Sequence, residues 1–519
     1  MKRRHFLRNA GVLFPSLVGG FSFRAYGADA DIMRTLLMPV TETDHVFVII
    51  QLTGGNDGLN MVIPLEHFDS YANARQNIFI PQDKAIKLTD KVGLHPAMTG
   101  LESMYKTGSL KVVQSVGYPQ PSFSHFRATD IWMSASDSNT VVNTGWAGRY
   151  LNYEYPNFPN GYPNTTMTDP LAIQIGSTTS FTLQGPAVNM GMSLSSTSNF
   201  YNLINGIQDP APNTPAGKEL TYVREIAQQT QQYATVIKAA ATQTVQQVSY
   251  PANNSLGDQL KIVARLIRGG LKTRVYMVSY GGFDTHSVQV NSTDTTTGNH
   301  ANLLKNVSDA IRAFQDDLKF LGVEDRVVGM TFSEFGRRIK SNGSTGTDHG
   351  AAAPLFVFGK NVLGGVLGDT PNIPTNATVN DNIPFQYDFR SVYSTILANW
   401  LCVNDLDLQQ IMLKNFQILP LVNAGACKKA VNLSGDMLIS NYPNPFTSST
   451  IITFNTAGGH TLVQILDTTG RVVTNLTDKE YTAGTYTVVF DGTYLPTGIY
   501  YARLQNMAAQ QVRAMIKVR

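Results

Sequence analysis

The sequence predicts an α/β domain, with a mostly parallel central sheet flanked by helices, followed by a small all-β C-terminal sandwich. Continuous apolar runs with helical patterns between them predict the sheet. A change of composition after about residue 430 predicts the sandwich, because short apolar–polar alternations split by turn residues replace the long runs there. With 519 residues, the chain is long enough for two or three domains.

The N-terminus reads as a signal peptide over residues 1–27. It has a basic start, a short apolar stretch broken by Pro15, and small residues before Ala28. Arg3-Arg4-His5-Phe6-Leu7 resembles the twin-arginine export motif, and the alternative is an ordinary signal with two chance arginines. We therefore expect an exported mature chain that begins near Ala28. No later segment is long and apolar enough to predict a transmembrane span.

Five apolar runs predict the strands of the main domain, which we place at residues 28–428. The runs cover residues 45–52, 110–116, 274–279, 326–332 and 354–358. Residues 300–321 carry an apolar stripe at helical spacing and stand directly before one of these runs. Helix followed by strand is the order of a mostly parallel α/β sheet. Residues 429–437 then read as a linker, and residues 438–519 as the sandwich.

Residues suited to catalysis or metal binding follow four of these runs and precede the fifth. Since ligands bind beyond the carboxyl ends of parallel strands, we expect these side chains to meet in one cluster. They are Asp57, Ser124 and His125, Asp284 and His286, Glu334, and finally Asp348 and His349. Several carboxylates stay ionised together only around a cation, so one or two divalent ions (Zn, Mn, Mg or Ca) are expected. Ser124 is the candidate nucleophile and Ser122 the second choice.

Six short motifs carry a family resemblance over residues 45 to about 425. They are Gly54-Gly55-Asn56-Asp57-Gly58, Ser124-His125-Phe126, Gly145-Trp146-Ala147-Gly148-Arg149, Gly282-Phe283-Asp284-Thr285-His286, Ser333-Glu334-Phe335-Gly336-Arg337 and Thr347-Asp348-His349-Gly350. This part resembles domain-of-unknown-function family 1501, a family of secreted, sulfatase-like bacterial proteins grouped with the alkaline-phosphatase superfamily. The resemblance implies an alkaline-phosphatase-like fold and a metal-dependent hydrolase of phosphate or sulfate esters.

Residue by residue, the resemblance implies two sets of functional side chains. The implied metal ligands are Asp57, Asp284, His286, Glu334, Asp348 and His349, with His300 as an alternative partner for Asp284. The implied catalytic residues are Ser124, His125 and Arg149. Glu334-Phe335 replaces the superfamily's usual Asp-His pair, which points to a single ion or to a site without catalysis. Simpler interpretations stay open: Asp57 as a helix cap, His349 as a loop histidine, and Arg149 as a structural residue.

Four motifs in the last 80 or so residues carry a second resemblance. They are Tyr442-Pro443-Asn444-Pro445-Phe446, Asp467-Thr468-Thr469-Gly470-Arg471, Leu495-Pro496-Thr497-Gly498-Ile499-Tyr500 and Lys517-Val518-Arg519. This segment resembles the type A C-terminal sorting domain recognised by the type IX secretion system of the Bacteroidetes. The resemblance implies the secretion machinery as partner, and delivery to the cell surface or the extracellular space of a Gram-negative bacterium. The alternative is a generic carbohydrate-binding sandwich.

Composition excludes some functions and leaves others open. A net charge of +3 without basic blocks beyond the N-terminus argues against a nucleic-acid partner. Cys402 and Cys427 have no metal-binding spacing, so they form one disulfide or remain two buried thiols. Neither cysteine nor any serine starts the x-Pro-x-Arg pattern of a formylglycine sulfatase. A small-molecule or polysaccharide ester remains open as substrate, and the alternative function is a catalytically inactive, surface-anchored binding or structural protein.

Overall fold

The computed structural model describes residues 43–423 apart from 196–232 and 245, together with Cys427 and residues 438–518 apart from 457, 469, 483 and 507–509. The chain divides into two compact units, with the boundary between Lys429 and Ala430. The predicted signal peptide and the predicted linker at 429–437 lie outside the described residues.

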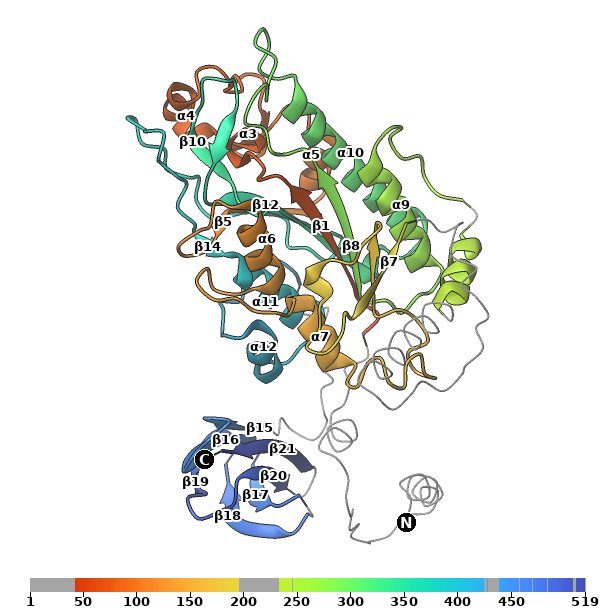
Figure 1. The fold of residues 1–519 in the computed structure, drawn as a ribbon, viewed down its shortest axis with the longest axis vertical. Coiled ribbons are helices and arrows are strands. Elements are labelled where there is room, and N and C mark those ends of the chain that lie inside the picture. Colours follow the sequence, from red (N-terminus) through yellow and green to blue (C-terminus); the bar gives the residue numbers. More distant parts are fainter. Residues whose placement is uncertain are drawn as a thin grey trace, which may run out of the picture. The chain divides into compact units, whose positions relative to one another are not determined.

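A nine-stranded sheet forms the centre of the larger unit, in the order β13-β5-β12-β9-β1-β8-β6-β7, with β14 beside β5 (Figure 1). Its strands are β1 (Val46–Thr53), β5 (Leu110–Gly117), β6 (Ala172–Ile175), β7 (Gly191–Leu194), β8 (Val275–Gly281), β9 (Val327–Phe332), β12 (Ala353–Phe358), β13 (Gly365–Leu367) and β14 (Tyr387–Asp388). Every pairing is parallel except those of β12 with β5 and β9. The predicted fold class is therefore confirmed, including the mostly parallel sheet.

Helices cover both faces of this sheet. One core contains side chains of α5 (Thr99–Lys106), α9 (Ser255–Arg268) and α10 (Asn299–Phe320). The other contains side chains of α6 (His125–Ser134), α7 (Trp146–Glu154), α11 (Phe389–Asn399) and α12 (Asp405–Met412). In β1, Val48 and Ile50 join the first core, whereas Phe47 and Ile49 join the second. Successive strand side chains point to opposite faces, so a strand covered on both sides must be apolar throughout.

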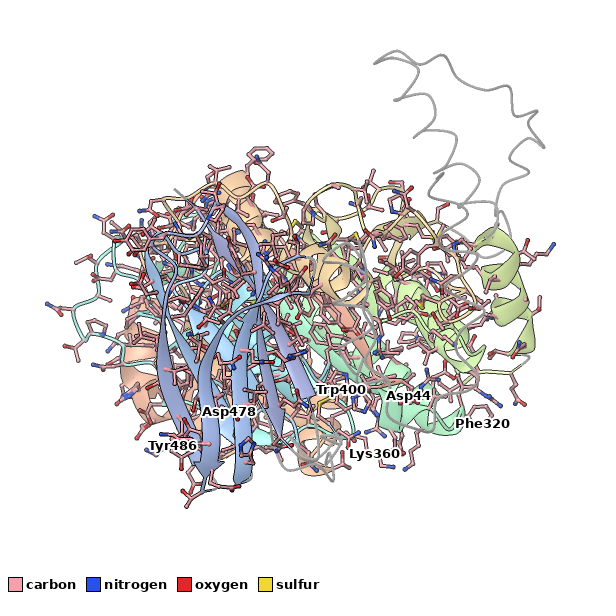
Figure 2. The ribbon with its side chains drawn as sticks, turned by 90° about the horizontal axis from the view of Figure 1, so that it is seen from below. Asp44, Phe320, Lys360, Trp400, Asp478 and Tyr486 are labelled. Carbon is pink, nitrogen blue, oxygen red and sulfur yellow. A yellow bond between two sulfur atoms is a disulfide. The ribbon has the colours of Figure 1, made fainter. Side chains whose placement is uncertain are left out.

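The reversed strand β12 brings an extra segment to the end of the sheet at which the parallel strands have their carboxyl ends. Because it runs against its neighbours, its amino end lies beside the carboxyl ends of β5 and β9. The hairpin of β10 (Arg337–Ser341) and β11 (Thr347–His349) precedes it there. At the opposite edge lie Asp44 before β1, Phe320 at the end of α10 and Lys360 after β12 (Figure 2).

The remaining elements of this unit are short. They are α3 (Gly58–Met61), α4 (Phe68–Ala74), the 3-10 turns η1 (Leu65–His67), η2 (Phe181–Leu183) and η3 (Glu324–Arg326), and a small sheet of β2 (Val62–Pro64), β3 (Ile86–Lys87) and β4 (Val92–Leu94).

The smaller unit is all-β. One antiparallel sheet contains β15 (Leu438–Tyr442), β16 (Ser449–Thr456) and β19 (Gly484–Asp491). The other contains β17 (Gly459–Leu466), β18 (Val472–Tyr481), β20 (Gly498–Asn506) and β21 (Gln510–Lys517). Side chains from both sheets share one core, which includes Ile452 and Phe454 of β16 and Val463 and Ile465 of β17. This is the sandwich that the alternating pattern predicts.

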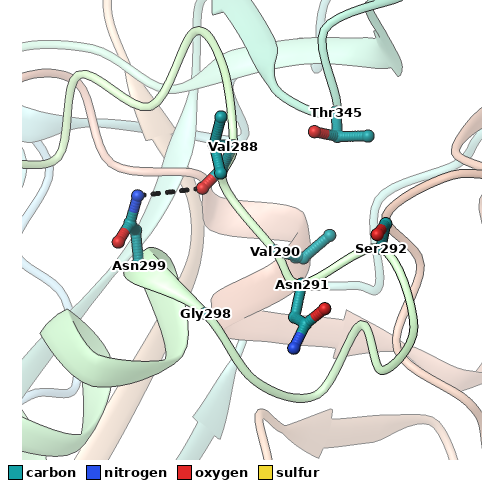
Figure 3. Close-up of a pocket in the computed structure, with 7 residues that line it drawn as sticks. All are labelled: Val288, Val290, Asn291, Ser292, Gly298, Asn299 and Thr345. Carbon is teal, nitrogen blue, oxygen red and sulfur yellow. Dashed lines mark hydrogen bonds between the residues drawn. The ribbon is translucent and has the colours of Figure 1, made fainter.

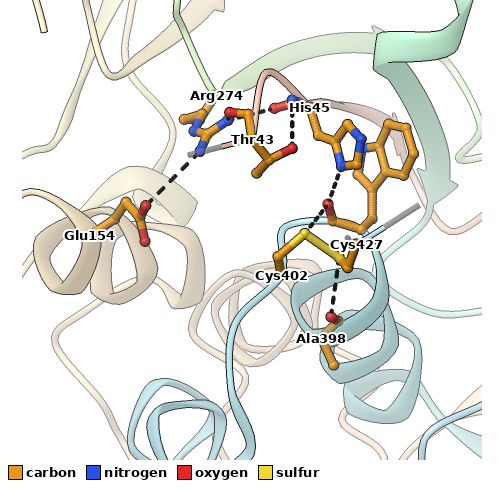
Figure 4. Close-up of a disulfide and its surroundings, with 8 residues drawn as sticks. Thr43, His45, Glu154, Arg274, Ala398, Cys402 and Cys427 are labelled. Atoms are coloured by element: carbon orange, nitrogen blue, oxygen red, sulfur yellow. Dashed lines mark hydrogen bonds and ion pairs between the residues drawn. A yellow bond between two sulfur atoms is a disulfide. The ribbon is translucent and has the colours of Figure 1, made fainter. Parts of the chain in front are cut away.

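Cys402 and Cys427 form a disulfide, which settles the alternative that the sequence left open (Figure 4). The bond lies beside Trp400, on which the His45 ring stacks with centroids 3.9 Å apart, and His45 Nδ1 donates to the Trp400 carbonyl at 2.6 Å. Disulfides of this kind are typical of proteins that leave the cytoplasm. None of the helices described here is sufficiently long and apolar to cross a lipid bilayer.

Candidate functional site

Three histidines and one carboxylate from three segments meet at the carboxyl ends of the strands of the sheet. His125 is the first residue of α6, Asp284 and His286 follow β8, and His349 ends β11. We call these four residues the histidine cluster. Its three histidine rings are one-quarter to two-fifths exposed, and Asp284 is 48% exposed. The sequence predicted that these positions would meet, and the structure brings them together.

The Nε2 atoms of all three histidines point at a single carboxylate oxygen. Asp284 Oδ1 lies 3.1 Å from His286 Nε2, 3.3 Å from His349 Nε2 and 3.6 Å from His125 Nε2. Ligands held about 2.0–2.1 Å from a tetrahedral ion are about 3.3–3.4 Å apart. The ligand atoms of His125, Asp284 and His349 all lie within 4.8 Å of one another and could hold one divalent ion, whereas His286 Nε2 lies close to Asp284 and His349 but outside that group. His286 Nε2 and His349 Nε2 are 2.8 Å apart, so their rings must separate by several tenths of an ångström to admit the ion.

The opposite nitrogen of each histidine is held by an acceptor. His125 Nδ1 lies 2.8 Å from Glu334 Oε1, and His286 Nδ1 lies 3.2 Å from Asp348 Oδ1. His349 Nδ1 donates to the Phe123 carbonyl at 2.7 Å. A proton fixed on Nδ1 leaves the lone pair on Nε2, which is how proteins orient metal-binding histidines. The resemblance implied that Glu334 and Asp348 are ligands; the structure brings both to the cluster, but on the Nδ1 side of the rings.

Arg337 sets the charge of the central carboxylate. Its buried guanidinium lies 2.6 Å from Asp284 Oδ1 and also donates to the carbonyls of Gly55 and Thr347. Burial works to raise the pKa of Asp284, but the hydrogen bond and charge of Arg337 outweigh it and lower that pKa. Burial lowers the pKa of His349 despite its bond to the Phe123 carbonyl. An ionised aspartate and a neutral histidine are the forms that bind a metal.

A glycine loop after β1 closes the buried side of the cluster. Gly54 donates its backbone amide to Glu334 Oε1 at 2.9 Å, and Glu334 is only 2% exposed. Gly54 has φ +123°, and a Cβ there would lie 2.4 Å from the backbone nitrogen of Asp284. Only glycine therefore allows this loop to approach Asp284 so closely.

Asp57, an implied metal ligand, lies in a separate buried ion pair. Arg75 Nη1 lies 2.6 Å from Asp57 Oδ2, and Gln289 Nε2 donates to the same oxygen at 2.6 Å. Arg75 also donates to the Ile339 carbonyl at 2.8 Å. Burial works to raise the pKa of Asp57, but the charge of Arg75 acts in the opposite direction, and the pKa is lowered overall. The structure does not bring Asp57 into the histidine cluster, because its carboxylate neutralises Arg75.

The implied catalytic residues Ser124 and Arg149 are placed very differently. Ser124 is the exposed N-cap residue of α6, directly before His125, and within the described part of the chain its hydroxyl has no hydrogen-bond partner. Arg149 is buried in α7 and donates to the carbonyls of Ser134 at 2.8 Å and Ile411 at 2.6 Å. Arg149 thus ties α7 to its neighbours away from the cluster, as the structural alternative expected.

A pocket of about 330 Å³ lies beside the loop that follows His286 (Figure 3). Asn299 donates to the Val288 carbonyl at 2.9 Å on one side of it, and Thr345 stands on another. Its lining residues carry no titratable group. The chemistry of this edge of the sheet is therefore concentrated in the histidine cluster.

Comparison with protein families decides where the larger unit belongs. The family described as "Protein of unknown function (DUF1501)" matches residues 47–403. The chain belongs to this family. The family described as "Secretion system C-terminal sorting domain" matches residues 440–518. No functionally curated protein matches the chain.

Solved structures resemble the DUF1501 chain at low identity. The PsFucS1 sulfatase from Pseudoalteromonas sp. is 11% identical, with 86% of this chain and 84% of that chain covered and a TM-score of 0.32. An alkaline-phosphatase-superfamily protein from Vibrio parahaemolyticus is 8% identical, with 92% and 84% covered and a TM-score of 0.30. PorZ, a surface component of the type IX secretion system of Porphyromonas gingivalis, is 21% identical; the match covers 18% of this chain and 12% of PorZ, with a TM-score of 0.13.

The DUF1501 domain also buries two histidines near Asp57. His300 Nε2 lies 2.9 Å from Asn56 Oδ1, and the rings of His95 and His300 are 6.3 Å apart. Burial lowers the pKa of His300 to about 4, against the attraction of Asp57, and lowers the pKa of His95 to about 3. Both residues are therefore neutral in the folded protein at every pH above about 5.

We expect the free energy of unfolding to fall as the pH falls from about 7.5 to about 5. In the unfolded chain both histidines have a pKa of about 6.5. The unfolded state therefore binds protons that the folded state excludes, and acid favours unfolding. Urea unfolding of metal-free protein, followed by tryptophan fluorescence, measures the slope. His300→Gln should reduce it, whereas His67→Gln, at a half-buried position in η1, should not. Equal slopes in both variants would contradict the assignment.

Proposed function

We propose that this protein is a metal-dependent hydrolase of phosphate or sulfate esters that acts outside the cell. The observation that carries the proposal is the convergence of three Nε2 atoms on Asp284 Oδ1, with every Nδ1 held by an acceptor. Three imidazoles and one carboxylate form a donor set that suits zinc better than magnesium or calcium. When bound, the ion would supply positive charge against the oxygens of the ester.

Ser124 is the proposed nucleophile because of its position. It occupies the N-cap position of the ten-residue helix α6 without a capping hydrogen bond, and the first amides of the helix have no partner within it and favour an anion. His125, the next residue, places this helix end against the cluster. Ser124 Oγ would form a bond to phosphorus or sulfur as the bond to the alcohol oxygen breaks, and its proton would leave with the alcohol. Water then hydrolyses the serine ester and restores the hydroxyl.

The smaller unit indicates where in or outside the cell the hydrolase acts. A C-terminal sorting domain indicates export to the cell surface or the extracellular space, and interaction with the secretion machinery. We place the hydrolase there.

The test is Ser124→Ala in the purified full-length protein. We expect turnover to fall at least ~1,000-fold, because removing a nucleophile removes the covalent route. Metal affinity should stay within a few-fold, since a hydroxyl adds little beside three imidazoles. Turnover of aryl phosphates, phosphodiesters and aryl sulfates is measured with zinc, manganese, magnesium and calcium.

Ser122→Ala is the matched control, because Ser122 Oγ accepts only a long bond of 3.4 Å from the Ser124 amide. Loss of turnover in Ser122→Ala but not in Ser124→Ala would show that Ser124 is not the nucleophile. A wild-type protein that binds no metal and hydrolyses no ester would instead favour the surface-anchored binding protein without catalysis.

A further inference from the structure

The histidine cluster is open to solvent. Asp284 is 48% exposed, His286 43% and Asp348 56%. Sites for small ligands usually enclose most of the ligand surface. An open site leaves most of a small ester in water, so it favours a substrate that makes further contacts beyond the reacting group.

Two exposed phenylalanines flank the proposed nucleophile. Phe126 follows His125 in the first turn of α6 and is 87% exposed. Phe123 is 37% exposed, and its carbonyl is the acceptor that holds His349 Nδ1. Aromatic side chains offer a large, rigid apolar surface, and exposed ones beside a site are typical binding groups.

Strand β10 adds a positive charge beside the Phe123 ring. Its alternation buries Arg337 and Ile339 and turns Arg338 and Lys340 outward. The Arg338 guanidinium lies 5.1 Å from the centre of the Phe123 ring and donates to the Asn380 carbonyl. Across the described ranges, neither Arg338 nor Lys340 forms an ion pair, unlike Arg337, which pairs with Asp284. The Arg338 charge is therefore available to an anion that reaches the cluster.

We propose that the substrate is an anionic polysaccharide, with a sugar ring packed on Phe126 and a second anionic group bound by Arg338. This rests on the proposed function, because the ester to be cleaved is the one that reaches the histidine cluster. A sugar ring presents a face of C–H groups that packs on an aromatic ring, and a sulfated or phosphorylated chain carries further anions a few ångströms away. Nucleic acid is disfavoured, because it requires a broad basic surface, whereas the whole chain has a net charge of +3.

Binding of fluorescein-labelled dextran sulfate to the zinc-loaded full-length protein tests the proposal without turnover. We expect Arg338→Gln and Phe126→Ala each to weaken binding ~10-fold. Arg268→Gln and Phe320→Ala are matched controls: both positions are exposed and lie at the ends of α9 and α10, at the opposite edge of the sheet. They should leave the affinity unchanged, and neutral dextran should bind much more weakly than dextran sulfate.

Turnover of a small aryl ester separates this proposal from the hydrolase itself. Wild-type turnover of that ester reports the hydrolase alone, because the ester has neither a sugar ring nor a second anionic group. If the wild type hydrolyses no ester but Arg338→Gln and Phe126→Ala still bind dextran sulfate more weakly, the hydrolase proposal is wrong and the polysaccharide-binding surface is supported. Equal binding by all four variants, or tighter binding of single-stranded DNA than of dextran sulfate, overturns the polysaccharide proposal.

Discussion

Asp284→Ala should abolish both zinc binding and ester hydrolysis. All three cluster histidines direct Nε2 to one oxygen of Asp284, so the substitution removes the carboxylate on which they converge. It also leaves the buried Arg337 guanidinium without its counter-charge, which repels a cation. We expect zinc affinity to fall at least ~100-fold. Competition with a chromophoric chelator measures the affinity, and elemental analysis measures the zinc content.

Two comparison variants make this result specific. Asp258→Ala removes an exposed aspartate in the first turn of α9 and should bind zinc like the wild type. Glu334→Gln removes the negative charge beside His125 Nδ1 but keeps the shape of the side chain, so a loss of only ~10–100-fold is expected. Retained zinc in Asp284→Ala would show that the ion binds outside the histidine cluster.

Asp57→Ala should destabilise the larger unit by about 3–5 kcal/mol without weakening zinc binding in the molecules that remain folded. The substitution leaves Arg75 buried with no counter-ion, and an unpaired buried charge costs about that much. The zinc affinity should stay within a few-fold, because Asp57 Oδ2 is bound to Arg75 and Gln289 rather than to the cluster. This result would separate Asp57 from the ligand role that the family resemblance implied.

Urea unfolding followed by tryptophan fluorescence measures the change in free energy. Trp132, Trp146 and Trp400 all lie in the larger unit, so the signal reports that unit alone. Asp57→Asn combined with Arg75→Gln is the control, since removing both charges together should cost less than the sum of the two single variants. Additive costs, or loss of zinc with unchanged stability, would contradict the ion-pair assignment.

The strands of the sheet were predictable because burial on both faces demands apolar residues at every position. Residues 45–52 and 326–332 were predicted, and β1 and β9 begin and end within one residue of them. The direction of β12 was not predictable, because an apolar run reads the same whichever way the strand is paired. That reversal is what brings His349 back to the carboxyl ends of the other strands.

The position of the site followed from the sequence, but the part played by each side chain did not. Polar residues after successive parallel strands must meet, and His125, Asp284 and His286 do. Sequence spacing does not tell which nitrogen of an imidazole faces a nearby carboxylate. The sequence therefore predicted Glu334 as a metal ligand, whereas the structure places it against His125 Nδ1. No signal indicated Arg75, because it lies in an irregular segment 18 residues after Asp57 and pairs with it only through the fold.

The Cys402–Cys427 bond has a mechanical consequence for a chain that carries a C-terminal sorting domain. Cys427 is the last described residue of the larger unit, three positions before the boundary at Ala430, and its bond ties it to Cys402, just after α11. A pull on the chain beyond Cys427 is therefore transmitted covalently to Cys402 near the end of α11, and the segment between the two cysteines, which are 25 positions apart, bears none of the load. If the chain were cut after Cys427, the disulfide would still hold this end of the larger unit to Cys402, so the end could not unfold separately from the residues around Cys402.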